Sequence, residues 1–156
     1  MPTKKLKEFL DANHVKYITM SHSKAYTAQQ VAAALHIKGK KLAKTVMINI
    51  DGKMGMAVLP ASYKVDFDKF RDFIKANQVG LASEQEFKDR FPGCEVGAMP
   101  PFGNLYQMDV FVAASLVEDE DLLFNSGSHT ELIKMAYKDF ENLTKPSIIR
   151  FSYKSI

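Results

Sequence analysis

The 156-residue sequence contains no tryptophan and a single cysteine, Cys94. One cysteine cannot form an internal disulfide, which is typical of proteins from a reducing compartment. The sequence also lacks an apolar run of the roughly 18 residues that a membrane span needs. Its charged N-terminus, Met-Pro-Thr-Lys-Lys-Leu-Lys-Glu, has no signal-peptide core. We therefore expect a cytoplasmic protein without a membrane partner.

Several kinds of catalytic site are missing as well. The chain has no Gly-x-Ser-x-Gly elbow, no phosphate-binding Gly-Lys-Ser/Thr loop and no His-Glu-x-x-His helix. Its four histidines are far apart in the sequence and lack the spacing of metal ligands. We expect no metal and no cofactor. Cys94 follows a Pro-Gly turn, and we interpret it as an incidental thiol rather than a nucleophile.

The net charge of +3 permits contact with nucleic acid without requiring it. Lysines cluster at four positions, Lys38, Lys40, Lys41 and Lys44. This cluster fits either a solvated hairpin end or a patch that contacts phosphates. The helix expected beside it, residues 28–36, is almost uncharged, and no helix carries the Arg/Asn/Gln set that base readout needs. We therefore do not expect sequence-specific DNA binding.

Periodicity and turn signals predict the order of the elements. Helices are expected over 3–13, 27–36 and 137–143, and strands over 16–20, 108–113, 122–124, 131–136 and 148–151. Asp51-Gly52 between apolar runs 44–50 and 54–59 predicts a hairpin. Asp66 is expected to cap a helix whose core face carries Phe67, Phe70, Phe73 and Ile74. Ser83 and Glu86 form a capping box for a helix that should stop at Pro92-Gly93.

Strands and helices alternate here without a regular βαβ rhythm, and residues 118–121 form an acidic turn. This order favours a mixed α/β (α+β) fold, with helices packed around a mixed sheet, over a doubly wound fold. The sequence shows no repeat, low-complexity tract or linker. We expect residues 1–156 to form a single domain.

Three segments are candidates for a functional site. The first is a loop with two glycines bracketing two prolines, made of Gly97, Ala98, Met99, Pro100, Pro101, Phe102 and Gly103. Glycine lets a backbone approach a ligand closely, and proline fixes the shape of a loop. The pattern is typical of a rigid loop that presents its backbone, or of a buried connector that only turns the chain.

The second candidate is Lys44, at the mouth of an expected internal strand. Its ammonium group could contact a phosphate or a carbonyl oxygen, or its stem could simply lie along the sheet. The third is the stretch from Phe124 to Thr130, in which Gly127 and small polar residues could direct backbone N–H groups at an acceptor. His129 in this stretch is either a proton carrier or an ordinary hydrogen-bonding residue.

In this order, the segments Ala43-Lys44-Thr45-Val46, Val58-Leu59-Pro60, 97–103 and 125–129 resemble the YbaK/prolyl-tRNA-synthetase-associated domain family of aminoacyl-tRNA editing proteins. The resemblance implies a curved, mainly antiparallel mixed sheet surrounded by helices. It also implies hydrolysis of the ester between a mischarged amino acid and the 3′-terminal adenosine of tRNA. The expected partners are the acceptor end of aminoacyl-tRNA and an aminoacyl-tRNA synthetase.

Carried onto this chain, the resemblance implies catalytic roles for Lys44, Gly97 and Gly127. Substrate contacts are expected at His22, Thr45, Ala98, Met99, Pro100, Pro101, Phe102, Gly103, Ser126, Ser128 and His129, and tRNA contacts at Lys38, Lys40 and Lys41. Backbone groups and the substrate's own hydroxyls, rather than a protein nucleophile, would perform the reaction. The chain differs from cysteinyl-specific members at Ala98 and Pro100, so the amino acid stays open. The alternative function is an inactive module of the same fold that binds tRNA or a synthetase.

Overall fold

The computed structural model describes residues 2–21, 42–87, 89–91, 94 and 98–154. Its helices are α1 (Pro2–Ala12), α3 (Phe67–Ile74), α4 (Glu84–Phe87), the 3-10 turn η1 (Gly103–Leu105), α5 (Ala114–Val117) and α6 (Tyr137–Thr144). Its strands are β1 (Tyr17–Ser21), β2 (Ala43–Ile50), β3 (Lys53–Pro60), β4 (Tyr63–Val65), β5 (Val79–Leu81), β6 (Asp109–Ala113), β7 (Asp121–Asn125), β8 (Glu131–Ala136), β9 (Ser147–Ile149) and β10 (Ser152–Lys154). None of the helices within these ranges is long and apolar enough to cross a membrane.

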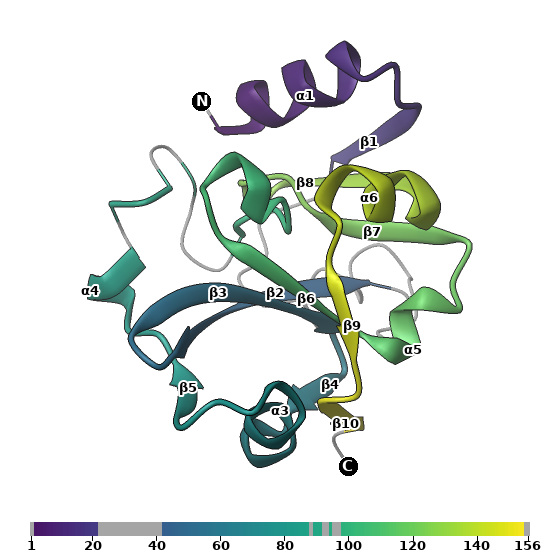
Figure 1. The fold of residues 1–156 in the computed structure, drawn as a ribbon. Coiled ribbons are helices and arrows are strands. Elements are labelled where there is room, and N and C mark those ends of the chain that lie inside the picture. Colours follow the sequence, from purple (N-terminus) through teal and green to yellow (C-terminus); the bar gives the residue numbers. More distant parts are fainter. Residues whose placement is uncertain (1, 22–41, 88, 92–93, 95–97, 155–156) are drawn as a thin grey trace.

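The fold is built in layers around a five-stranded sheet of order β5-β2-β3-β6-β9. Strand β3 pairs antiparallel with β2 and parallel with β6, and this mixture confirms the expected mixed α+β class. A second sheet, β1-β8-β7, lies above the first together with α1 and α6 (Figure 1). Helix α3 and the two-stranded β4–β10 ribbon lie below it (Figure 1).

Each face of the five-stranded sheet packs against its own group of apolar side chains. The upper core, between the two larger sheets and under α1 and α6, includes Leu6, Met56, Val58, Phe102 and Phe124. The lower core, between the sheet and α3, includes Ile48, Ala57, Leu59, Phe70 and Phe151. Because side chains alternate along a strand, neighbouring residues of β3 enter different cores. This is why a run from Gly55 to Pro60 is buried without interruption.

Local signals in the sequence predicted several elements well. The β2–β3 hairpin turns at Asp51 and Gly52, both with positive φ, as an Asp-Gly hairpin turn requires. The side chain of Asp66 accepts a hydrogen bond from the Lys69 N–H at 3.0 Å and caps α3. The capping box is also confirmed: the Glu86 N–H donates to Ser83 Oγ, and the Ser83 N–H donates to the Glu86 carboxylate.

Other expectations were wrong. Phe73 does not face the core but is 57% exposed, whereas Phe70 is fully buried and Phe67 and Ile74 pack against the lower core. The helix capped by Ser83 ends at Phe87, not at residues 92–93, which lie outside the described part of the chain. The stretch before the acidic turn, for which the sequence predicted no element, forms the short helix α5. The strand expected over 148–151 ends at Ile149 as β9, which pairs with β6, and a separate strand, β10, follows and pairs with β4.

Gly103 lies in close backbone contact with the start of β6, in the upper core. A Cβ atom at this position would lie 2.5 Å from the Met108 carbonyl oxygen and 2.7 Å from a methyl carbon of Val110. The Gly103 carbonyl accepts hydrogen bonds from the N–H groups of Tyr106 and Met108, both at 2.9 Å. The loop therefore closes tightly onto the start of β6, and any side chain at residue 103 would force the two apart.

We predict that Gly103→Ala lowers the free energy of unfolding by about 1–3 kcal/mol, the usual cost of overpacking a core. Gly80→Ala is the matched control, because a Cβ at Gly80 meets no atom within 4 Å. Urea denaturation followed by circular dichroism measures both. Equal stability of the two variants would contradict the packing described here.

Candidate functional site

The start of β2 lies beside β7, although about 80 residues separate them in the sequence. Leu42 and Leu123 form a parallel bridge. Lys44 follows this bridge by two residues on one segment, and Asn125 follows it by two residues on the other. Their predecessors Ala43 and Phe124 belong to the upper core. Alternation therefore directs Lys44 and Asn125 to the side of their strands opposite the upper core.

Lys44 lies in a poor environment for a cation. It is half-buried, and burial is the main cause that lowers the pKa of its ammonium group. The second cause is the nearby ammonium group of Lys64 in β4. No carboxylate within the described ranges forms an ion pair or hydrogen bond with Lys44. A lysine held in this way reduces stability, and such perturbed groups concentrate at functional sites.

Asn125 is the second unusual polar group. The residue is 8% exposed, and its Oδ1 is buried without a hydrogen-bond partner among the described residues. An unsatisfied buried acceptor costs about 1–3 kcal/mol, so native proteins rarely keep one without a use for it. The sequence placed Asn125 in a candidate stretch but assigned no role to its side chain, although a polar residue that ends an apolar strand before Ser-Gly is a usable signal.

The loop after Asn125 has a fixed backbone. Gly127 adopts a φ of 117°, a conformation that side chains rarely tolerate. The fully buried Ser126 donates its hydroxyl to the Glu131 carboxylate at 3.0 Å, and its N–H donates to the Glu131 carbonyl at 3.3 Å. These bonds hold the two ends of the loop together, with Gly127 at its turn.

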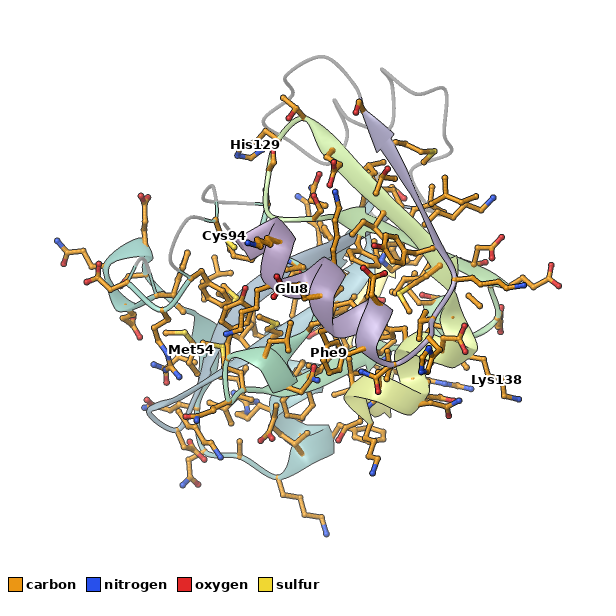
Figure 2. The ribbon with its side chains drawn as sticks, turned by 90° about the horizontal axis from the view of Figure 1, so that it is seen from above. Glu8, Phe9, Met54, Cys94, His129 and Lys138 are labelled. Carbon is orange, nitrogen blue, oxygen red and sulfur yellow. The ribbon has the colours of Figure 1, made fainter. Side chains whose placement is uncertain are left out.

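The rest of this loop is also internally bonded. The hydroxyls of Ser128 and Thr130 lie 2.8 Å apart, and the Thr130 N–H donates to Ser128 Oγ at 3.1 Å. His129 is 6% exposed and lies on the connection between β7 and β8 (Figure 2). The sequence-predicted residues Ser126, Gly127, Ser128 and His129 therefore form one compact turn next to Asn125.

The proline-containing loop supports the site from the core side. All six residues from Ala98 to Gly103 are buried. The Phe102 ring packs against Phe9, Phe124 and Phe140, with ring centroids 6.1, 5.6 and 5.4 Å away. Met99 and Phe102 thus contribute to the upper core. Through the Phe102–Phe124 contact, this loop is packed against the strand that carries Asn125.

Helix α1 contacts both loops. The Lys7 ammonium lies 3.2 Å from the Glu131 carboxylate that binds Ser126. The Lys5 ammonium donates to the Leu105 carbonyl at 3.0 Å, just after the proline-containing loop, and lies 4.8 Å from the centre of the Tyr106 ring. Neither lysine was singled out from the sequence, because nothing in a regular amphipathic helix identifies which polar residues meet distant loops.

The remaining predicted residues fall into two groups. Thr45 lies next to Lys44 on β2, partly buried. His22, Lys38, Lys40, Lys41 and Gly97 lie outside the described residues. Burial raises the pKa of the Cys94 thiol, which disfavours the reactive thiolate. No group of three or more potential metal ligands occurs among the residues that were placed.

Part of the sequence is similar to known proline–tRNA ligases. Over 75 residues the chain is 31% identical to the proline–tRNA ligases of Bacillus mycoides strain KBAB4 and Bacillus cereus strain AH187. The aligned part is 48% of this chain and 13% of each ligase, so it spans only a small portion of those enzymes.

Two solved structures share the fold over nearly the whole chain. One is described as hypothetical protein APE2540, with a TM-score of 0.85, 18% identity and coverage of 96% of this chain and 99% of that one. The other is a proposed trans-editing enzyme for prolyl-tRNA synthetase, with a TM-score of 0.81, 15% identity and coverage of 97% of both chains. At these identities the likeness concerns the fold.

A sequence model for the aminoacyl-tRNA editing domain matches residues 22–143. This range contains β2 with Lys44, the proline-containing loop, and β7 with the turn that follows Asn125. The match covers most of the sequence and includes each segment from which the candidate site is built. The chain therefore belongs to the aminoacyl-tRNA editing domain family.

Proposed function

We propose that this protein is an aminoacyl-tRNA deacylase that hydrolyses the ester of mischarged tRNA in trans. The observation that carries the proposal is the pair formed by Lys44 and Asn125. Among the described residues, a half-buried cation without an acidic partner and a buried amide oxygen without a donor each follow, by two residues, the bridge that joins Leu42 to Leu123. Together they can bind a ligand that offers both an electron-rich oxygen and a hydrogen-bond donor, as an aminoacyl ester does.

The reaction needs little from the protein beyond placement and charge, because the ester is already activated. Water adds to the carbonyl carbon, and negative charge collects on the carbonyl oxygen, where the Lys44 ammonium stabilises it. The bond to the ribose 3′-oxygen then breaks. A proton from the attacking water passes through the neighbouring ribose 2′-hydroxyl to that oxygen. Asn125 Oδ1 accepts a hydrogen bond from the substrate's ammonium group, which fixes the orientation of the ester.

The turn at Gly127 supplies the backbone side of the site. Its left-handed conformation brings consecutive N–H groups into reach of a bound oxygen, and the Ser126–Glu131 bonds keep that shape before substrate arrives. Thr45, Ser128 and His129 flank the bound adenosine in this proposal. The buried loop that includes Pro100 and Pro101 limits the space behind the amino acid, which is how a larger cognate residue would be rejected.

A deacylation screen tests the proposal directly. The purified protein is mixed with alanyl-, cysteinyl- and seryl-tRNA, each charged on a mismatched tRNA, and with prolyl-tRNAPro as the correctly charged control. We expect at least one mischarged species to be hydrolysed faster than the control. Binding of these tRNAs without any hydrolysis would instead support the inactive binding module.

Replacing Lys44 should separate function from stability. We expect Lys44→Met to reduce deacylation about 10²–10³-fold, the typical loss when one group that stabilises an oxyanion is removed. Because the folded-state pKa is lowered, the charged form opposes folding at every pH below that pKa, and this penalty disappears in the variant. The melting temperature should therefore stay equal or rise. Lys53→Met, at the exposed far end of the same hairpin, should change neither property; a wild-type rate for Lys44→Met would contradict the role of Lys44.

The like charge of Lys64 should be visible in a titration. Because Lys64 lowers the pKa of Lys44, Lys64→Gln should move that pKa upward toward its ordinary value of 10.5. The ammonium form of Lys44 would then persist to higher pH. NMR titration of the Lys44 Cε signal, assigned with Lys44→Met, measures the shift. An unchanged pKa in Lys64→Gln would show that the two side chains do not interact.

Asn125 offers an independent test. We expect Asn125→Leu, which keeps the number and branching of the side-chain heavy atoms, to raise the free energy of unfolding by about 1 kcal/mol, because it removes an unsatisfied buried acceptor. The same change should raise KM for the aminoacyl-tRNA. Asn142→Leu, on the exposed face of α6, is the matched control and should leave KM unchanged. A loss of stability in Asn125→Leu would indicate that the amide serves the fold rather than the substrate.

A further inference from the structure

A polar cavity lies on the opposite side of the five-stranded sheet from α1. It has a volume of about 280 Å³ and is lined by Tyr63, Lys69, Ser115, Glu118, Arg150 and Ser152, with Ala114. These residues come from β4, α3, α5 and the segment from β9 to β10. Figure 1 shows α3 and the β4–β10 ribbon below the sheet, with α5 at the edge of the sheet near β9.

The two cations of this cavity are held on one rigid support. Asp66 links their segments, because its N–H donates to the Phe151 carbonyl at 2.6 Å and its side chain accepts from the Lys69 N–H. Phe151 is fully buried and packs against Phe70, with ring centroids 5.0 Å apart. The backbones of Lys69 and Arg150, each adjacent to one of these anchors, are therefore held in a fixed relation.

The charge of the cavity is unbalanced. Lys69 and Arg150 are exposed, and neither forms an ion pair with any described residue. Glu118 is the one carboxylate that lines the cavity. Ser115 contributes a hydroxyl whose Oγ is buried and has no hydrogen-bond partner in the described structure. Two cations with hydroxyls around them match the donors that bind a phosphate group.

This cavity lies on the same side of the sheet as the side chain of Lys44. Lys44 pairs with Leu59 on β3, and Leu59 faces the lower core beneath the sheet. Lys64, which lies close enough to Lys44 to affect its charge, is next to Tyr63 at the cavity. Positive charge thus continues from the candidate site to the cavity without crossing the sheet.

We propose that the cavity of Lys69, Arg150 and Ser115 binds a backbone phosphate of the tRNA acceptor arm while the aminoacylated 3′ end occupies the candidate site. The inference rests on the proposed function for its ligand. It assigns to the lower face of the protein a role in holding the RNA, separate from the groups that act on the ester. Lys69 and Arg150 contact only RNA that extends beyond the terminal adenosine.

The experiment compares a phosphate-rich probe with a phosphate-free one. Lys69→Gln/Arg150→Gln is measured for binding to a fluorescein-labelled RNA minihelix ending in CCA, and for hydrolysis of 3′-O-alanyl-adenosine and of an alanyl-minihelix. The control is Lys4→Gln/Lys138→Gln, with the same change in charge on α1 and α6, across the sheet from α3. Figure 2 shows the Lys138 side chain pointing outward from the molecule.

We expect the cavity variant to bind the minihelix severalfold more weakly. The slope of log Kd against log salt should become shallower by about 0.7–0.9 for each phosphate that the variant no longer binds. Hydrolysis of 3′-O-alanyl-adenosine should be unchanged. Lys69→Arg/Arg150→Lys should retain most of the affinity, since it preserves the charge. The control should match the wild-type protein in every assay.

Two results would overturn the proposal. One is an unchanged minihelix affinity and salt slope in the cavity variant, including the case in which inorganic phosphate binds the cavity and RNA does not. The other is an equal loss on the phosphate-free substrate, which would mean that the residues serve folding or the reaction. If the wild-type protein hydrolyses neither ester yet binds the minihelix through Lys69 and Arg150, the proposed function fails while the RNA site stands.

Discussion

Burial of β3 on both faces is the constraint on which the rest of the structure depends. A strand in this position cannot satisfy its backbone by contact with water, so it needs a hydrogen-bonding neighbour on each side, which β2 and β6 provide. Its side chains in turn need two separate apolar layers, one beneath α1 and α6 and one above α3. Helices and strands must therefore pack on both faces of the sheet. The two loops and the cavity described above lie where these packed elements connect to the sheet.

The candidate site shows the opposite character from this core. Where β3 is fully satisfied, Lys44 and Asn125 each retain a polar group that the described part of the protein leaves uncompensated. Polar groups that are left unpaired for a ligand lower the folding stability of the unliganded protein, because no partner offsets the cost of burying them. The buried aromatic contacts of Phe102 and the bonds between Ser126 and Glu131 offset this locally and keep the site in shape.

The sequence predicted the features that depend on neighbouring residues. The Asp51-Gly52 turn and the Ser83–Glu86 capping box need only a few consecutive positions, and both are present. Three-residue strands such as β4 and β10 could not be predicted, because their pairing joins segments almost 90 residues apart and such short strands have no measurable periodicity. Phe73 was misassigned for a related reason: the pattern of a helix shows an apolar stripe, but only the tertiary contact decides how much of the stripe is covered.

The same distinction holds within the site. Lys44 and the glycine-containing turn were identified because lysine at a strand mouth and glycine in a polar loop are informative residue types. Asn125 became visible only when its surroundings in the described structure could be observed, and the contacts of Lys5 and Lys7 only when α1 was placed. Such properties belong to the arrangement of residues in space rather than to any residue type.

Helix α1 and strand β1 lie before residue 22, where the match to the editing family begins. Nevertheless Leu6 and Leu10 of α1 are fully buried, and β1 pairs with all five residues from Glu131 to Met135 of β8. Shortening the chain to the matched range would leave β8 as an exposed sheet edge above an uncovered apolar surface, the combination that promotes pairing between molecules. The unit that is recognised across the family and the unit that covers its own apolar surface therefore have different boundaries.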